Sequence, residues 1–207
     1  MKKVLFYTNQ FFGQIGGEAE AYQKPFIEQG ARGNAQAFVP LLEDAEIVAT
    51  IVCGDNYYAE NMDEVKAFVE AQITELSPDL IIAGPAFNAG RFGIACADIC
   101  KDAVQKMHVE AITGLYEENP AVEMYRKDIY ILKVGKSAAA MRKAVKLMAG
   151  FANKLLAGEE IGLPKEEGYY PKGKRVNVFR QKNGAERAMD MLLKILKGEP
   201  YETELEI

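Results

Sequence analysis

The chain has 207 residues, 49% of them hydrophobic, which is enough for one substantial core and within the usual size of one domain. Its formal charge of −5, with basic residues scattered along the chain, argues against a nucleic-acid-binding surface. Its apolar stretches are too short for a secretory signal or for the roughly 20 residues that cross a bilayer, so we expect a cytoplasmic protein without membrane insertion.

Short runs rich in valine, isoleucine, leucine and tyrosine recur along the chain, bounded by glycine, proline, asparagine or aspartate. They predict five β-strands, at residues 3–8, 46–52, 79–83, 109–113 and 129–134. Continuous apolar runs of this kind are typical of strands that are covered on both faces.

Segments with the helical spacing of apolar residues lie between these strands. Two of them span residues 62–76 and 92–107, and a third follows Ser137, which stands where an N-cap belongs, and ends at Gly158. Alternating strands and helices predict an α/β fold with a doubly wound, mostly parallel five-stranded sheet. We expect a flavodoxin-like or Rossmann-like three-layer sandwich.

The carboxyl-terminal part departs from this alternation. Residues 159–183 contain prolines, glycines and charged residues, and predict an irregular surface loop with a short strand at 175–179. Residues 184–197 resume a helical stripe, which ends at Gly198 and is followed by an acidic tail. We expect all of 1–207 to form a single α/β domain.

Glycine-rich polar loops follow four of the predicted strands. If those strands are parallel neighbours, their loops share the carboxyl edge of the sheet, where open α/β proteins bind ligands. We therefore expect the functional site at that edge. The candidate ligand-binding residues in these loops are Asn9, Gln10, Asp55, Asn56, Asn88, Arg91, Glu118 and Asn119.

Three of these loops carry charges that suit a small zwitterion. Arg91 stands before a helix, and its guanidinium, with amide groups from Gly84 to Gly90, suits a carboxylate or phosphate. Asp55 or Glu118 would then face a cationic nitrogen. The alternative is that Arg91 forms a surface ion pair and that the aspartate and asparagine residues cap helices or form turns.

No catalytic residue and no metal site is predicted. His108 is the single histidine, so a serine-histidine hydrolase or a histidine-rich metal site would lack its base or its ligands. The odd number of cysteines suits a reducing compartment; Cys96 and Cys100 are expected in the core, whereas Cys53 ends a strand at the loop edge and is a candidate ligand contact. The first loop matches neither the dinucleotide nor the Walker pattern.

The same loops also carry a family resemblance, which spans nearly the entire chain in consistent order. Its residues are Asn9-Gln10-Phe11-Phe12 with Gly16-Gly17-Glu18, Cys53-Gly54-Asp55-Asn56-Tyr57, Ala83-Gly84-Pro85-Ala86-Phe87-Asn88-Ala89-Gly90-Arg91, Thr113-Gly114 with Glu118-Asn119-Pro120, Ser137-Ala138-Ala139 with Met141-Arg142-Lys143-Ala144, Gly184-Ala185 with Arg187-Ala188, and Lys197-Gly198-Glu199-Pro200. This set resembles the amino-terminal half of the component B selenoprotein subunit of glycine, sarcosine and betaine reductases.

The resemblance implies a role in reductive deamination. Members of the family cleave an amine from glycine or an N-methylated relative and pass the carboxymethyl group to a selenoprotein partner, component A. Their selenocysteine lies in a later portion of a longer chain, and a pyruvoyl-bearing subunit helps to bind the substrate. The resemblance therefore implies an oxidoreductase subunit with those partners, without a cofactor in this chain and inactive in isolation.

Several alternatives stay open at this point. The chain could be a product limited to the amino-terminal half, one part of a split protein, or a short relative that binds without reducing. It could also be a non-catalytic flavodoxin-like interaction module or scaffold, since aromatic residues gather in the loops and interfaces favour them. A homo-oligomer is compatible with each alternative, and an FMN protein is a weaker one, because the first loop lacks a Ser/Thr-rich phosphate clasp.

Overall fold

The computed structural model of the chain describes residues 1–173 and 181–201. These fall into two units, Met1–Gly173 and Lys174–Ile207, which are described separately. The strand predicted at 175–179 lies outside the described residues.

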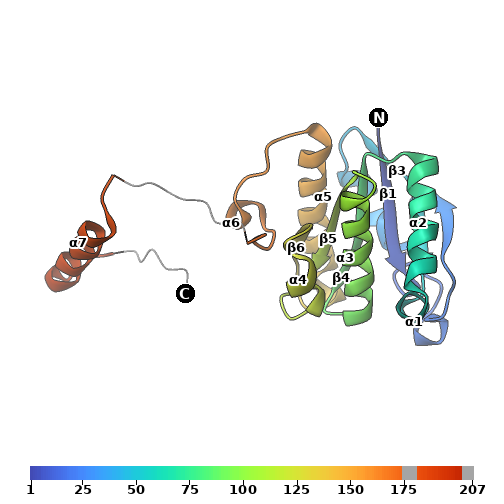
Figure 1. Cartoon of the computed structure of the whole chain (residues 1–207), viewed down its shortest axis with the longest axis horizontal. Helices are drawn as coiled ribbons and strands as arrows, with labels where there is room; N and C mark the ends of the chain where they lie inside the picture. Colours follow the sequence, from blue (N-terminus) through green and yellow to red (C-terminus); the bar gives the residue numbers. More distant parts are fainter. Residues whose placement is uncertain (174–180, 202–207) are drawn as a thin grey trace. The chain divides into compact units, whose positions relative to one another are not determined.

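The first unit is built on a six-stranded sheet with the order β2-β3-β1-β4-β5-β6 (Figure 1). All neighbouring strands are parallel except β2, which runs antiparallel to β3. The five predicted strands are confirmed, and β2 is a sixth strand at the edge. The strands are β1 (Lys2–Asn9), β2 (Phe26–Gln29), β3 (Ala45–Cys53), β4 (Leu80–Phe87), β5 (Glu110–Leu115) and β6 (Tyr130–Lys133).

Helices connect the parallel strands, as predicted, and several short helical turns are added. Ser137 precedes a 3₁₀ turn rather than the long helix and makes no side-chain capping bond, so the long helix starts three residues later than expected. The α-helices of this unit are α1 (Asp55–Glu60), α2 (Met62–Leu76), α3 (Gly90–Gln105), α4 (Pro120–Tyr125), α5 (Met141–Ala157) and α6 (Pro164–Glu167). The 3₁₀ turns are η1 (Glu18–Glu20), η2 (Gly33–Ala37), η3 (Val39–Leu41) and η4 (Ala138–Ala140).

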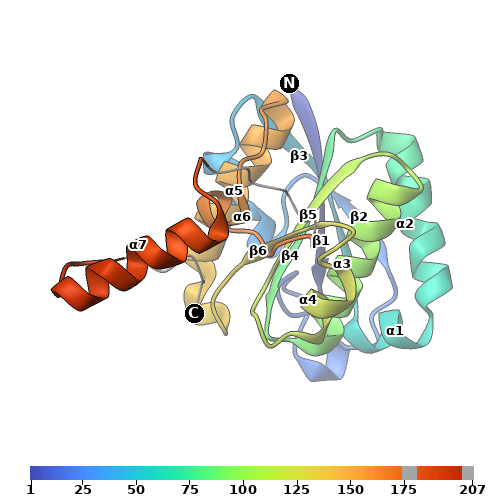
Figure 2. The same cartoon turned by 60° about the vertical axis from the view of Figure 1, so that its left-hand side comes forward.

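Helices cover both faces of the sheet, which explains why its strands are continuously apolar. In β1, Leu5 and Tyr7 pack into the core under α1 to α4, whereas Val4 and Phe6 pack into a second core under α5 and η2. Figure 2 shows α5 on one side of the sheet and α2 and α3 on the other. Alternate residues of each buried strand therefore serve opposite cores.

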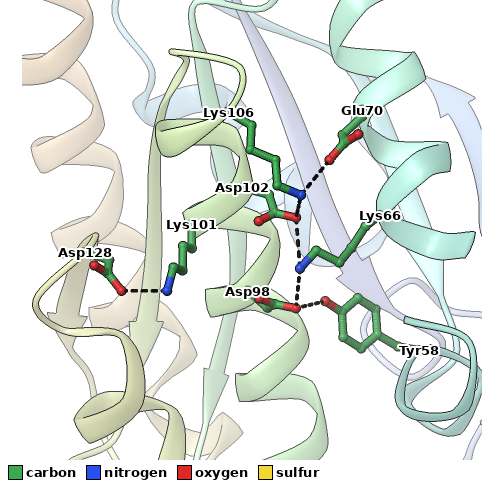
Figure 3. Close-up of polar contacts among 8 residues, drawn as sticks. All are labelled: Tyr58, Lys66, Glu70, Asp98, Lys101, Asp102, Lys106 and Asp128. Atoms are coloured by element: carbon green, nitrogen blue, oxygen red, sulfur yellow. Dashed lines mark hydrogen bonds and ion pairs between the residues drawn. The ribbon is translucent and has the colours of Figure 1, made fainter. Parts of the chain in front are cut away.

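A network of charged residues joins α2 to α3 (Figure 3). Lys66 of α2 lies between two aspartates one turn apart on α3, with Nζ 3.0 Å from Asp98 Oδ2 and 2.9 Å from Asp102 Oδ2. Tyr58, which is buried, donates its hydroxyl to Asp98 Oδ2 at 2.8 Å. Lys106 continues the network outward by pairing with Asp102 and Glu70. This network fixes how α1, α2 and α3 meet.

The second unit contains the predicted carboxyl-terminal helix, α7 (Gly184–Lys197). Asn183 caps its first turn by accepting a hydrogen bond from the Glu186 N–H at 3.0 Å, and Gly198 ends it with a left-handed φ of 69°. Among the helices that the structure describes in either unit, none combines the length and apolar character needed to cross a bilayer.

Candidate functional site

A cavity of about 330 Å³ opens at the carboxyl edge of the sheet. Among the parallel strands, β1 lies between β3 and β4, and the order of connection reverses there, as in flavodoxin-like sheets. The cavity is formed by the segments that follow β1, β3, β4 and β6. Its lining residues are Asn9, Gln10, Phe11, Phe12, Gly17, Glu18, Asp55, Ala86, Phe87, Asn88, Ala89, Lys136, Ser137 and Ala138.

The structure brings four of the nine candidate residues together in this lining, namely Asn9, Gln10, Asp55 and Asn88. The other five candidates lie in or next to the same loops but do not line the cavity. They are Cys53, Asn56, Arg91, Glu118 and Asn119. Their hydrogen bonds show what each of them does instead.

Asp55 is held by two buried amide side chains from the end of β1. Asn9 Nδ2 donates to Asp55 Oδ2 at 2.9 Å, and the backbone N–H of Asp55 donates to Gln10 Oε1 at 3.1 Å. Asn9 is itself fixed, because its Oδ1 accepts a hydrogen bond from the Phe12 N–H at 3.0 Å. The carboxylate is therefore rigidly placed at the wall of the cavity.

The second oxygen of this carboxylate is unsatisfied. Asp55 Oδ1 is buried, and no described residue donates a hydrogen bond to it. Burial raises the pKa of Asp55, and this effect is opposed by the hydrogen bond from Asn9, by the charge of Arg91 and by Gln10. An additional hydrogen-bond donor at this oxygen would stabilise the carboxylate.

Arg91 forms an ion pair, which the sequence analysis gave as the alternative to ligand binding. Its Nη2 lies 2.8 Å from Glu18 Oε1, and its Nη1 donates to Asn56 Oδ1. Half of the Arg91 side chain is exposed. Arg91 thus fastens the loop that carries Glu18, a lining residue, to the start of α1.

Glu118 and Asn88 meet a lysine that we did not predict. Lys136 Nζ lies 3.0 Å from Glu118 Oε2, which also accepts a hydrogen bond from Asn88 Nδ2 at 3.3 Å. Lys136 lines the cavity and lies over the ring of Tyr116, 5.5 Å from its centroid. This lysine is the positive charge of the lining.

Asn119 is a structural residue. It caps α4 by accepting a hydrogen bond from the Ala121 N–H at 3.1 Å, and it donates to the carbonyl oxygens of Phe87 and Ala89 at 3.0 and 3.2 Å. The amide approaches α3 so closely that a Cβ on Gly93 would lie 2.3 Å from its Nδ2. Asn119 therefore shapes the segment after β4 from behind the cavity.

Cys53 is fully buried at the end of β3. Burial raises the pKa of its thiol to about 12, with a smaller opposing contribution from Tyr7. Cys96 and Cys100 are buried as predicted, and burial also raises the pKa of both thiols. Each of the three is held as the neutral thiol, which is a poor nucleophile.

Aromatic rings form the apolar part of the lining. Phe12 packs against Phe87 and against the buried Phe92, with ring centroids 6.0 and 5.9 Å apart. Phe11 lies edge-on to Phe12 at 5.2 Å and is 60% exposed. Gly33 fixes this loop from below, because with a φ of 58° any Cβ there would lie 2.0 Å from the Phe12 carbonyl oxygen.

Three lining residues that the sequence analysis missed come from the segment after β6. Lys136, Ser137 and Ala138 follow the fifth predicted strand, and the rule that placed the other four loops at the carboxyl edge applies to this loop as well. The sequence analysis could therefore have predicted that this loop also lies at the site. Glu18 stands in the first glycine-rich loop, but its position depends on the long-range pair with Arg91.

The lining thus holds charges of both signs around a small apolar hollow. Asp55 and Glu18 are acidic, Lys136 is basic, and Asn9, Gln10, Asn88 and Ser137 add neutral polar groups. Within residues 1–173 and 181–201, no cluster of histidine, cysteine and carboxylate side chains has the composition of a metal site. Such a lining can bind and orient a small zwitterion.

Comparison with known proteins assigns the family. The family model described as glycine/sarcosine/betaine reductase selenoprotein B matches residues 1–207. The chain is 48% identical over 204 residues to the glycine reductase complex component B subunit gamma of Carboxydothermus hydrogenoformans, covering 98% of this chain and 47% of that protein.

Two proteins of Peptoclostridium acidaminophilum are also similar. Identity is 46% over 203 residues to the sarcosine reductase complex component B subunit beta, covering 98% of this chain and 47% of the relative. It is 45% over 209 residues to the betaine reductase complex component B subunit beta, covering 100% of this chain and 48% of the relative. The chain spans about half the length of the curated relatives it matches. No solved structure matches it. The chain belongs to the glycine/sarcosine/betaine reductase selenoprotein B family.

Proposed function

We propose that this chain is the substrate-holding part of a component B subunit and that its cavity binds a small amino acid. The carboxylate of Asp55 holds the ammonium group, and Lys136 holds the carboxylate. One observation carries the proposal: a carboxylate held by hydrogen bonds and a lysine line the same small hollow. The relatives' names, which refer to glycine, sarcosine and betaine, support this ligand class.

The role proposed for this chain is binding and orientation. The reductive step then belongs to groups outside residues 1–207, namely the selenocysteine and pyruvoyl group that the family resemblance implies. The three cysteines support this division of labour, because all are buried and their thiol pKa values are raised. A pyruvoyl-bearing subunit and the component A selenoprotein are accordingly the partners that we propose.

A docking surface for a partner is the second candidate function. The 60% exposure of Phe11 at the cavity favours it, since aromatic residues are enriched at protein interfaces. Sedimentation of the chain with the pyruvoyl-bearing subunit tests this role. A stable complex whose formation depends on Phe11, without heat from any amino acid, favours docking over ligand binding.

Calorimetric titration with glycine is expected to give a dissociation constant in the millimolar range, about 4 kcal/mol of binding free energy, because the ligand has few atoms. Replacing Lys136 with alanine is expected to weaken binding roughly tenfold, through loss of a charge-assisted hydrogen bond. Arg91→Ala is expected to change the dissociation constant by less than about twofold, because Arg91, unlike Lys136, does not line the cavity.

The Lys136 and Arg91 variants show which of the two residues binds the ligand carboxylate. A loss in Arg91→Ala alone would assign the ligand carboxylate to Arg91, as the sequence suggested. Absence of binding by the unaltered chain up to the solubility limit of glycine would contradict the proposed function.

As the pH is lowered, glycine affinity is expected to begin to fall at a higher pH than it would if Asp55 were an exposed aspartate. Protonation removes the charge that attracts the ammonium, and burial raises the pKa of Asp55 above its usual value of about 3.9. Affinity is therefore full above the raised pKa and is lost as pH falls through it. Titrations between about pH 4 and pH 7 measure this, with Asp55→Asn expected to bind weakly and without that dependence.

The folding stability of the chain provides the control. The raised pKa of Asp55 makes stability and glycine affinity change in opposite directions with pH. The folded chain binds the Asp55 proton more tightly than the unfolded chain, so the contribution of Asp55 to stability falls as pH rises through the interval between its usual and raised pKa. Asp55→Asn is therefore expected to unfold at pH 7 no more easily than the unaltered chain. A weak-binding variant that is also unstable would point to a structural role for Asp55.

A further inference from the structure

A groove of about 420 Å³ lies along α5, on the face of the sheet opposite α2 and α3 (Figure 2). It shares no lining residue with the cavity at the carboxyl edge. Leu147 and the buried Phe151 supply its apolar floor. The proposed amino-acid site makes no use of this groove. Its lining residues, from α5 and α6, are Lys143, Lys146, Leu147, Gly150, Phe151, Lys154, Glu166 and Glu167.

The charged residues of α5 are all basic, although the chain as a whole has a formal charge of −5. They are Arg142, Lys143, Lys146 and Lys154. Lys154 is neutralised, because its Nζ lies 2.9 Å from both carboxylate oxygens of Glu167 on α6. The other three side chains are exposed and form no ion pair with the part of the chain that the structure describes. The charge beside the groove is therefore positive overall, even with Glu166 on the opposite wall.

Gly150 leaves the groove open at the middle of α5. Glycine is less favourable than alanine inside a helix. A Cβ at this position would meet no atom within 4 Å, and the backbone does not have the positive φ that favours glycine. The contacts of the folded chain therefore give no reason for a glycine here. The close approach of a bound segment to α5 would give one.

We infer that this groove is the docking surface for a partner subunit and that it binds an amphipathic helix whose apolar side is flanked by carboxylates. The floor of the groove suits the apolar side of such a helix, and Lys143 and Lys146 suit its carboxylates. This inference rests on the proposed function, because it takes the pyruvoyl-bearing subunit as the partner. Ala138 lines the cavity and α5 begins at Met141, so a subunit docked along α5 also lies next to the amino-acid site.

Gly150→Leu separates docking from folding. Its side chain enters the open groove, so the affinity for the pyruvoyl-bearing subunit is expected to fall at least roughly tenfold. Replacing a glycine inside a helix is expected to raise the unfolding temperature of the chain by roughly 2–4 °C. Sedimentation velocity of the full chain with that subunit measures the affinity, and thermal unfolding measures the stability. Gly150→Ala is the matched variant, with a similar gain in stability and a smaller loss of affinity.

Reversing the charge of Lys143 and Lys146 together tests the acidic character of the partner helix. Lys143→Glu/Lys146→Glu is expected to weaken the complex at least roughly tenfold and to remove much of its salt dependence. Glutamate near the start of a helix is favourable, so unfolding of α5 would not explain the loss. Lys194→Glu/Lys197→Glu makes the same charge change at the same spacing on α7 and is expected to leave the complex unchanged.

Glycine titration of the same variants keeps this inference apart from the proposed ligand binding, because the groove and the cavity share no residue. All variants are expected to bind glycine as the unaltered chain does. A complex that tolerates Gly150→Leu, or that tolerates the charge reversal on α5, would overturn the inference and leave glycine binding standing. Absence of any complex would overturn it as well, and so would self-association of the chain that Gly150→Leu abolishes, since a second copy would then occupy the groove.

Discussion

Replacing Asp98 with alanine is expected to lower the free energy of unfolding by about 3 kcal/mol. Asp98 is 6% exposed, and one of its oxygens accepts hydrogen bonds from Tyr58 at 2.8 Å and from Lys66 at 3.0 Å (Figure 3). Its removal leaves the buried Tyr58 hydroxyl without its acceptor and Lys66 with Asp102 alone. Removing one member of a buried charged network is costly because the remaining members stay desolvated.

Chemical denaturation measures this loss, and for a domain of this size thermal unfolding should shift down by roughly 6–12 °C. Asp128→Ala is the matched control. Its pair with Lys101 is 3.0 Å long but lies where both side chains are about one-third exposed, so less than about 1 kcal/mol is expected. Equal effects of the two substitutions would contradict a stabilising role for Asp98 in the buried network.

The main architecture could be predicted from hydrophobic pattern because the central strands are buried on both faces. The edge strand β2 could not, since Phe26-Ile27-Glu28-Gln29 has only two apolar residues and its state depends on antiparallel pairing with β3. The helix α4 did leave a signal, with Asn119 at the N-cap and Pro120 at the first helical position. That signal competed with an interpretation of the same residues as a ligand-binding turn.

The location of the site could also be predicted from the sequence. Which polar residues line the cavity and which hold the loops in place could not. Parallel strands bring their following loops to one edge, and this placed Asn9, Asp55 and Asn88 together. Whether a loop residue faces the cavity depends on side-chain hydrogen bonds between segments far apart in sequence. Asn119 and Arg91 are examples, because their partners lie about 30 or more residues away.

Replacing Phe92 with alanine is expected to cost about 3–5 kcal/mol of folding stability and to weaken ligand binding through the shape of the cavity. Phe92 is fully buried in the first turn of α3, and its ring lies 5.9 Å from that of Phe12, which lines the cavity. The substitution leaves a void beneath Phe12, and close-packed interiors relax only partly around such voids. Denaturant unfolding and glycine titration of the same variant measure the two effects.

Phe11→Ala and Phe92→Leu test whether the effects of Phe92→Ala come from the void beneath Phe12. Phe11 is 60% exposed, so its removal is expected to change stability by less than about 0.5 kcal/mol and to act on binding alone. Leucine at position 92 fills much of the void and should recover part of both losses. If Phe92→Ala lost stability but bound glycine normally, the position of Phe12 would not matter to the ligand. The polar groups around Asp55 would then account for amino-acid binding without the aromatic side of the cavity.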